Sequence, residues 1–312
     1  MTTINSVLGP LDTKDLGFTL MHEHIMHSAA GIPQNYPELL GAGYVEQIMK
    51  GLVEAKAAGI STIVDATTMD LGRDVNLLAE VSRRSGVNII ATTGIWTDPP
   101  RYLTDFSPDR LAPVFVREIR QGIAGTSIKA GILKGASDKE GLTPGQATIL
   151  RAIARAHHQT GVPIILHTWS PTQVARQQLA VLKEENVDLN RVKVDHSSES
   201  TDIPYLTWLL DQGCYLGWDR GVNVTLETRA KTLKTLLDAG YADRICPSHD
   251  WANASMWWEA MPSVKQRMQQ ANPHGYLNTH RVFFPLLRNL GVSETTISRL
   301  GVVGPRSFFE GV

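Results

Sequence analysis

The chain is predicted to fold as a (β/α)8 barrel, and three observations lead to this prediction. Short apolar segments alternate with amphipathic segments along all 312 residues. Eight such strand–helix units in a chain of about 300 residues match the count of this barrel. Residues suited to metal binding stand at the ends of several apolar segments, and they converge only if those segments belong to one barrel. We therefore expect an α/β protein with a single domain over residues 1–312.

The predicted strands are short and rich in Val, Ile and Leu, as expected of parallel strands buried on both faces. They cover residues 18–24, 62–67, 88–93, 127–134, 163–168, 191–196, 214–219 and 244–250. The predicted helices between them cover residues 44–58, 75–85, 110–122, 145–160, 171–186, 203–212 and 226–239. Glycines that suit helix C-termini, such as Gly59 and Gly161, follow several of these helices. A doubly wound open sheet fits less well, because no GxGxxG turn follows the first strand.

Two long segments interrupt the alternation, residues 31–43 after the first strand and residues 251–280 after the eighth. Active sites of these barrels lie on the loops that follow the strands, so both segments belong to the expected catalytic face. The second contains Trp251, Trp257 and Trp258. For the last two, packing within a lid and contact with a substrate are both open interpretations.

Composition and charge exclude several classes of protein. The net charge is -1, which argues against a nucleic-acid or membrane-surface partner. Cys214 and Cys246 lie in apolar strands, so buried free thiols and a reducing cytoplasm are expected rather than a disulfide framework. The N-terminal segment has no basic region followed by an apolar core, so we expect no signal peptide. The sequence contains no apolar run of about 18 residues or more, so we expect no membrane span.

The sequence MHEH places two histidines near the end of the first strand. His22 and His24 are two positions apart, so both side chains point to the same face of a strand. In a barrel that face can be the lumen, and imidazole suits zinc, iron, cobalt and nickel. Two merely polar lumen residues are the alternative interpretation.

Lys134 ends an apolar strand, where a lysine most often extends to solvent at the barrel rim. Because four histidines converge beside Lys134, a reactive lysine becomes the better interpretation. A desolvated lysine near cations has a lowered pKa and is nucleophilic when neutral. It can then take up carbon dioxide as a carbamate, which can bridge two cations as a carboxylate would.

Three further candidate ligands stand at later strand ends. His167 and His196 end two neighbouring strands. A single histidine there is more often a hydrogen-bonded core residue, but two in succession, in register with the first pair, favour metal binding. Asp250 ends the last strand, where it can bind metal and also accept a proton. His249 should point the other way, and we interpret it as structural.

Together the six residues provide four imidazoles, one carbamate and one carboxylate, enough for two cations about 3.5–4 Å apart. Zinc is the first candidate, with cobalt, manganese and iron as alternatives. Two cations bridged by carboxylated Lys134 and a water would turn that water into hydroxide at neutral pH. One metal can polarise a carbonyl or phosphoryl oxygen while Asp250 carries away the proton. The predicted reaction is hydrolysis of an ester-like substrate without a covalent enzyme intermediate.

These residues lie in motifs that resemble the phosphotriesterase family of the amidohydrolase superfamily, from about Leu8 to Phe309. The matching stretches include GFTLMHEH, IKAGILK, DHSSESTDIPYL, YLGWDR and SHDW. The resemblance implies the same barrel, a homodimer and Lys134 as a carboxylated bridge. It also implies metal ligands at His22, His24, Lys134, His167, His196 and Asp250.

Three positions bear on the substrate within this resemblance. Trp96 resembles the phosphotriesterases, whereas Arg220 resembles the phosphotriesterase-like lactonases, which open acyl-lactones. Glu199 stands where the phosphotriesterases have an aspartate of a proton relay. Because the signals are mixed, that relay cannot be carried over. We expect Asp250, Arg220 and Trp96 to act in catalysis or substrate binding.

Three function classes stay open at this point. The first is a binuclear metal-dependent hydrolase of lactones or other carboxylic esters, with promiscuous hydrolysis of organophosphate triesters. The second is a dedicated phosphotriesterase (aryldialkylphosphatase). The third is a non-catalytic metal-binding barrel, which the intact ligand set disfavours. The expected partner is a small-molecule ester, lactone or organophosphate.

Overall fold

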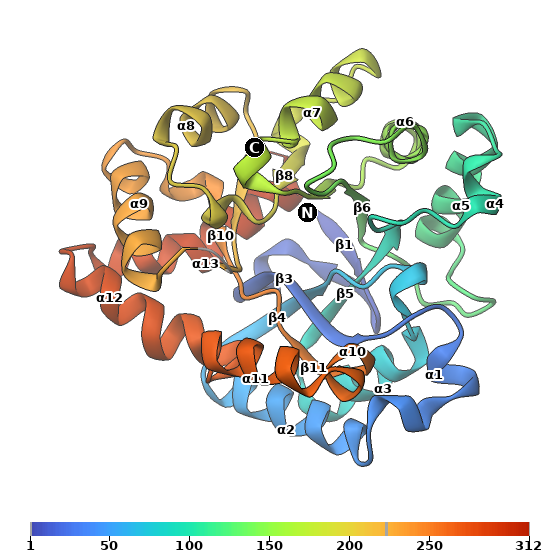
Figure 1. Ribbon diagram of the computed structural model, residues 1–312, viewed down its shortest axis with the longest axis horizontal. Helices are drawn as coiled ribbons and strands as arrows, with labels where there is room; N and C mark the ends of the chain where they lie inside the picture. Colours follow the sequence, from blue (N-terminus) through green and yellow to red (C-terminus); the bar gives the residue numbers. More distant parts are fainter. Residues whose placement is uncertain (1, 222–223, 312) are drawn as a thin grey trace.

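Nine parallel strands form one sheet in the order β10-β9-β8-β7-β6-β5-β4-β3-β11, and helices surround it (Figure 1). The computed structural model describes residues 2–221 and 224–311. The strands are β3 (Phe18–His27), β4 (Ile60–Asp65), β5 (Asn88–Gly94), β6 (Ile132–Ala136), β7 (Ile164–His167), β8 (Val192–Val194), β9 (Tyr215–Trp218), β10 (Ile245–Pro247) and β11 (Ala252–Ser255). All eight predicted strands are present, and the predicted (β/α)8 barrel is confirmed.

The helices that follow the strands lie on the outside of the sheet (Figure 1). They are α1 (Ile32–Asn35), α2 (Tyr44–Ala57), α3 (Val75–Ser85), α4 (Arg101–Thr104), α5 (Pro108–Arg120), α6 (Pro144–Thr160), α7 (Ala175–Glu184), α8 (Ile203–Asp211), α9 (Leu226–Asp238), α10 (Met256–Ala260), α11 (Pro262–Ala271), α12 (Phe284–Asn289) and α13 (Glu294–Glu310). Helix α6 starts at a capping box in which Thr143 and Gln146 bind each other's backbone N–H groups. None of the helices in the described ranges has the length and apolar character that crossing a bilayer requires.

Three predicted features differ from the structure. The helix expected at residues 171–186 begins only at Ala175, because Gln173 takes a left-handed conformation with φ 53°. The strand expected at residues 127–134 begins only at Ile132, because the Ala130 N–H donates to a carbonyl of α5 instead of a neighbouring strand. An N-terminal antiparallel hairpin of β1 (Thr3–Ser6) and β2 (Gly9–Asp12) was not predicted.

The inside of the strand ring is filled by a separate apolar cluster. Barrel strands contribute Met21, Val64, Ile90, Ile132, Ile165, Tyr215 and Cys246 to it. Phe308 and Phe309 of α13 complete the cluster, and Ile4 and Leu11 of the hairpin pack against it. The cysteines Cys214 and Cys246 are buried and free, which confirms that prediction. The lumen is therefore a packed core below the polar end of the barrel.

A short segment after β10 closes the ring between the last strand and the first. Strand β10 pairs with β9, and β11 then pairs in parallel with β3. Between them, the Asp250 N–H donates to the His22 carbonyl at 3.1 Å and the His24 N–H donates to the Trp251 carbonyl at 2.8 Å. The polypeptide thus crosses from one side of the seam to the other at residues 248–251.

Glu23 of β3 holds this crossing segment in place. Its side chain is fully buried. The Oε1 atom accepts hydrogen bonds from the Ser248 hydroxyl (2.7 Å), the His249 N–H (2.9 Å) and His249 Nδ1 (2.7 Å). The Oε2 atom accepts one from the Trp251 N–H at 2.9 Å. Since hydrogen bonds to a buried charged group are strong, this carboxylate clamps the barrel seam.

We predict that Glu23→Gln lowers the free energy of unfolding by at least about 2 kcal/mol, because an amide cannot accept at every position that the carboxylate fills. Urea unfolding followed by circular dichroism measures the change. The matched control is Glu80→Gln, which removes an exposed ion pair with Arg84 on α3. That variant should stay within about 0.5 kcal/mol of the parent. Equal losses in both variants would contradict a clamp at Glu23.

Candidate metal centre

The six candidate ligands gather at the C-terminal ends of the barrel strands. His22 and His24 lie on β3, Lys134 on β6 and His167 at the end of β7. The remaining two, His196 and Asp250, follow β8 and β10. Five of the six are buried and Asp250 is half-buried. The barrel therefore brings together residues that are up to 228 positions apart (250 − 22) in the sequence.

A first group consists of His22, His24 and Asp250, whose ligand atoms all lie within 4.8 Å of one another. The Asp250 Oδ1 atom is 3.4 Å from His22 Nε2 and 3.3 Å from His24 Nε2. The other ring nitrogen of His24, Nδ1, is 2.7 Å from the Thr67 hydroxyl, which fixes the ring orientation. The register between β3 and β4 shifts between Leu20 and Glu23. Irregularities of this kind re-aim side chains beside active sites, and His22 lies within this one.

A second group consists of His167 and His196. His196 Nε2 is 2.9 Å from His167 Nδ1, and the two rings meet edge to face with centroids 4.5 Å apart. The His196 ring is also 5.0 Å from the ring of His22, which connects the two groups. On its far side, His196 Nδ1 is 2.9 Å from Asp219 Oδ1. Such a carboxylate fixes which nitrogen of the imidazole faces the centre.

Lys134 is fully enclosed beside these groups. Its side chain is 1% exposed, and its Nζ donates to the Ala66 carbonyl at 2.8 Å. Burial lowers the pKa of this amine to about 8, even though the negative charges of Asp250, Asp70 and Asp65 favour the ammonium form. A sizeable fraction of the amine is therefore neutral near physiological pH, as carbamate formation requires.

The backbone at two of the six residues is in the left-handed region, which non-glycine residues rarely adopt. The φ angles are 62° at His196 and 55° at Asp250. Hydrogen bonds hold both: the His196 N–H donates to Asp219 Oδ2 at 3.2 Å, and the Asp250 N–H donates to the His22 carbonyl. Conformations of this kind cluster at active sites, where they turn a side chain inward directly after a strand.

Two buried carboxylates that sequence reasoning missed lie directly behind the histidines. Asp195 Oδ2 faces His22 Nδ1 at 2.9 Å, and Asp219 contacts His196. Asp195 also contacts the buried ammonium of Lys193. Gly217 makes room for both, because a Cβ atom there would lie 2.3 Å from Asp195 and 3.0 Å from Asp219. The sequence signal that could have identified these two aspartates is their position at strand ends, at the end of VKVD and of YLGWD.

Arg220 joins two carboxylates at the mouth of the centre. Its Nε donates to Glu199 Oε1 at 2.9 Å, and a terminal nitrogen donates to Asp250 Oδ2 at 3.3 Å. The arginine therefore holds Glu199 and Asp250 together, as an always-charged fork can. The ring of Trp96 lies 6.0 Å from that of His167, on another side of the centre.

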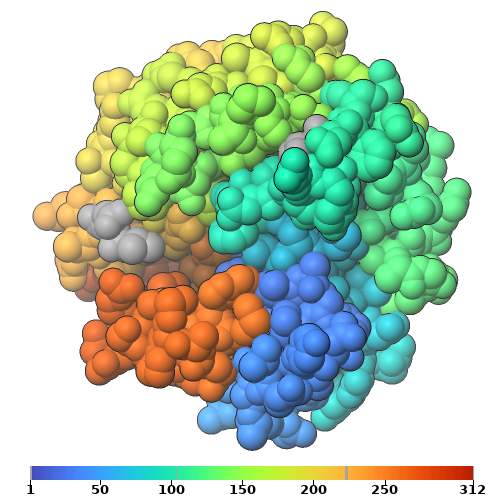
Figure 2. Space-filling view, turned by 45° about the vertical axis from the view of Figure 1, so that its right-hand side comes forward, coloured from blue at the N-terminus to red at the C-terminus, as the bar shows by residue number. Residues whose placement is uncertain are grey.

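The tryptophans after the last strand have different surroundings. Trp258 is buried against Trp251, with ring centroids 4.7 Å apart. Trp257 instead contacts His27, whose ring is 4.3 Å away. The α10–α11 segment (orange) forms the face of the protein next to residues after β3 (blue), including Pro37–Leu40 (Figure 2). His249 is bound by Glu23 and Thr279 through both ring nitrogens, consistent with the structural role expected of it.

Three of the four histidines have the protonation state that a metal ion requires, and two of these have free donor atoms. Burial lowers the pKa of His22 and His196 well below their usual range and that of His167 to about 4, so the rings are neutral. Neutral imidazole is the form that binds metals. The Nε2 atoms of His22 and His167 are buried and have no hydrogen-bond partner among the described residues. The donor set therefore fits divalent cations of the zinc type.

The chain is similar to known proteins over almost its whole length. A family model described as the phosphotriesterase family matches residues 2–309. A phosphotriesterase homology protein from Mycobacterium tuberculosis is 40% identical, covering 99% of this chain and 98% of that protein. An aryldialkylphosphatase from Saccharolobus solfataricus is 34% identical, covering 96% of each. The solved phosphotriesterase from Mycobacterium tuberculosis superposes with a TM-score of 0.91 at 38% identity, covering 99% of this chain and 98% of that one. This chain belongs to the phosphotriesterase family.

Proposed function

We propose that this protein is a binuclear metal-dependent hydrolase of lactones or other carboxylic esters, with weaker hydrolysis of organophosphate triesters. The observation that carries the proposal is the convergence of four histidines, a buried lysine and Asp250 at one end of the barrel. Membership of the phosphotriesterase family supports it. In a barrel with a purely structural role, buried imidazole nitrogens would be expected to have hydrogen-bond partners, and here several have none among the described residues.

Two cations fit the two groups of residues. His22, His24 and Asp250 would hold one, His167 and His196 the other, and a carboxylated Lys134 would lie between them. When bound, two such cations acidify a water molecule and polarise the carbonyl or phosphoryl oxygen of a substrate. Zinc is the first candidate for this donor set, with cobalt, manganese and iron as alternatives.

Asp250 has the properties of a ligand that also accepts a proton. Burial alone would raise the pKa of its carboxyl, but the hydrogen bond from His24 and nearby positive charge, including that of Arg220, hold it well below its usual range. The carboxylate is therefore ionised at neutral pH. Arg220 cannot take a proton onward, because its guanidinium remains charged. Its role is to hold Asp250 and Glu199 in place, or to bind a polar group of the substrate.

Substrate preference depends on two positions with different chemistry. Arg220 favours lactones or esters as substrates. Its guanidinium lies at the entrance of the candidate metal centre and suits a substrate with polar groups beside the reacting carbonyl. Trp96 supports organophosphates as the second candidate, because its indole gives a flat apolar wall for an aryl group. The relative from Saccharolobus solfataricus, named as an aryldialkylphosphatase, is a further reason to keep this second candidate.

Metal dependence is the first prediction of this function. Removing metal with a chelator should abolish hydrolysis of a lactone panel and of aryl esters, and adding zinc, cobalt or manganese should restore it. Metal analysis of the restored protein should give two cations per chain, because two groups of ligands are present. Activity that survives complete metal removal would contradict the proposal, and clearly fewer than two cations per chain in active protein would contradict a binuclear site.

Carboxylation of Lys134 is the second prediction. Carbon NMR of protein loaded with metal and labelled bicarbonate should show one carbamate signal, and Lys134→Ala should remove it together with most metal affinity. Lys193 is the matched control, because it is equally buried and burial also lowers its pKa to about 8, but it contacts Asp195. Lys193→Met should keep the signal. A signal that depends on Lys193 instead would refute the assignment.

The role of Arg220 gives the third prediction. Arg220→His removes the fixed fork between Glu199 and Asp250 and introduces an aromatic base. The ratio of phosphotriester to lactone kcat/KM should rise by about tenfold, which corresponds to about 1.4 kcal/mol between the two transition states. Steady-state kinetics of both substrates with the same metal-loaded preparation measure the ratio. An unchanged or lower ratio would mean that Arg220 does not distinguish the substrates.

A further inference from the structure

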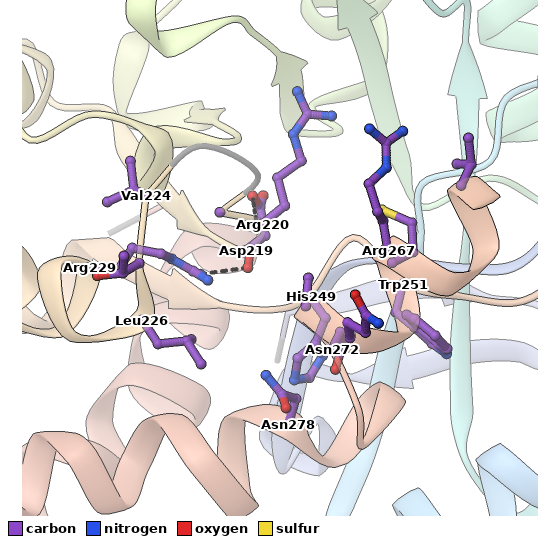
Figure 3. A pocket seen from close by; sticks show the side chains of 16 residues that line it. Asp219, Arg220, Val224, Leu226, Arg229, His249, Trp251, Arg267, Asn272 and Asn278 are labelled. Carbon is purple, nitrogen blue, oxygen red and sulfur yellow. Dashed lines mark hydrogen bonds between the residues drawn. The ribbon is translucent and has the colours of Figure 1, made fainter.

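A cavity of about 820 Å³ opens next to the metal centre (Figure 3). It lies between the segment after β9, which includes Asp219 and Arg220, and the segment that carries α11 and Asn278. Its wall is partly apolar, with Leu226 and Met268 among the lining residues. Asp219 contacts His196 and Arg220 contacts Asp250, so these two lining residues connect the cavity to the candidate ligands.

Arg229 of α9 brings to this wall a buried guanidinium that has no direct ion pair among the described residues. The residue is 8% exposed, and one terminal nitrogen donates to the Asp219 carbonyl at 2.7 Å (Figure 3). Its Nε is buried without a hydrogen-bond partner, and no carboxylate among the described residues forms an ion pair with it. Burial lowers the pKa of this guanidinium to about 10, although the negative charges of Asp219 and Glu199 favour its charged form. Unpaired buried charges are costly, so a ligand that pairs with Arg229 would gain binding energy.

The other buried arginines show how unusual this arrangement is within the protein. The side chain of Arg73 is 4% exposed and makes an ion pair with Glu118 at 2.8 Å. That of Arg220 is paired with both Glu199 and Asp250. Arg229 instead donates to a neutral carbonyl and lies over the ring of Phe283, 5.5 Å from its guanidinium carbon, while the nearby carboxylates of Asp219 and Glu199 form no ion pair with it. Of these three buried arginines, Arg229 is therefore the one without an ion pair among the described residues.

Arg267 of α11 adds a second guanidinium to the same cavity, on another side of it from Arg229 (Figure 3). Its side chain is exposed, and it forms no hydrogen bond or ion pair with any described residue. Asp219, the one acidic residue among the described residues of the lining, directs its carboxylate to His196 and the Arg220 N–H. The described residues of the wall therefore carry more positive than negative charge.

We propose that this cavity binds an anionic group of the substrate, a carboxylate, sulfonate or phosphate, through Arg229 and Arg267. The inference rests on the proposed hydrolase function and narrows it: the substrate is an ester or lactone whose hydrocarbon part ends in an anion. The apolar part of the wall contacts the hydrocarbon, and the guanidinium forks bind the anion, for which their geometry is suited. The reacting bond lies at the metal centre, beyond Asp219 and Arg220.

Matched pairs of esters test this proposal in the metal-loaded enzyme. Each pair compares a para-nitrophenyl hydrogen dicarboxylate with its neutral methyl ester, in the succinate, glutarate and adipate series. We expect kcat/KM to favour the charged member by at least about tenfold at the chain length that spans the cavity. Sulfonate and phosphate analogues of that length then identify which anion fits best. High salt should reduce the preference less than at an exposed site, because Arg229 is buried.

Two variants assign the preference to the cavity. Arg229→Gln keeps a donor for the Asp219 carbonyl, and Arg267→Gln changes an exposed side chain; each should lower the charged-to-neutral ratio by about tenfold. If Arg229→Gln does not fold, Arg267→Gln carries the test alone. The control Arg83→Gln, at an exposed position of α3 outside the cavity, should leave the ratio unchanged. No preference at any length, or a preference that survives in Arg267→Gln, overturns the proposal.

Binding without turnover separates this proposal from the hydrolase assignment. Calorimetry compares glutarate with methyl hydrogen glutarate, which differ only in the second carboxylate, so binding to a metal contributes to both. Tighter binding of glutarate that is lost in Arg267→Gln supports the anion site even if neither ester is hydrolysed. In that case the hydrolase function fails and the anion site stands. Equal binding of both compounds overturns the anion site whatever the activity.

Discussion

The closure of the barrel depends on one buried carboxylate. Glu23 sits between the two histidines of β3 and accepts four hydrogen bonds from residues 248–251, at the other end of the sequence. The same bonds shape the backbone that carries Asp250 in its left-handed conformation. Fold and site therefore share one interaction. Any change that loosens the seam also moves Asp250 away from His22 and His24.

The lumen is divided into two layers with opposite chemistry. At one end, Phe308, Phe309 and the apolar residues of the strands fill it completely. At the other, the imidazoles are surrounded by Asp195, Asp219 and the buried amines of Lys134 and Lys193. Because the apolar layer excludes water, the charges above it act in a medium where electrostatic interactions are strong. Burial away from water also lowers the pKa of His22, His167 and His196, and it lowers the pKa of Lys134 to about 8 against the effect of the nearby carboxylates.

Much of the fold could be predicted because each strand–helix unit has its own local pattern. The candidate ligands could be predicted because they stand at strand ends, where every barrel of this kind brings its residues together. The partners of these ligands could not. Glu23 is indistinguishable in MHEH from any other strand residue, since the nearest hydrogen-bond partner of its side chain is 225 positions away in the sequence. Asp195 and Arg229 likewise acquire their meaning only from the register of strands and helices that pack around them.

The distribution of the first three candidate ligands along the chain has a consequence for stability. His22 and His24 belong to the first barrel strand and Asp250 to the segment that closes the ring. A cation held by all three would act as a cross-link between the two ends of the barrel. Cross-links that close long loops restrict the unfolded chain most. Such an ion would therefore stabilise the whole fold as well as take part in catalysis. Loss of the ion would first loosen the seam at residues 248–251, and a protease would cleave the chain there before it cleaves elsewhere.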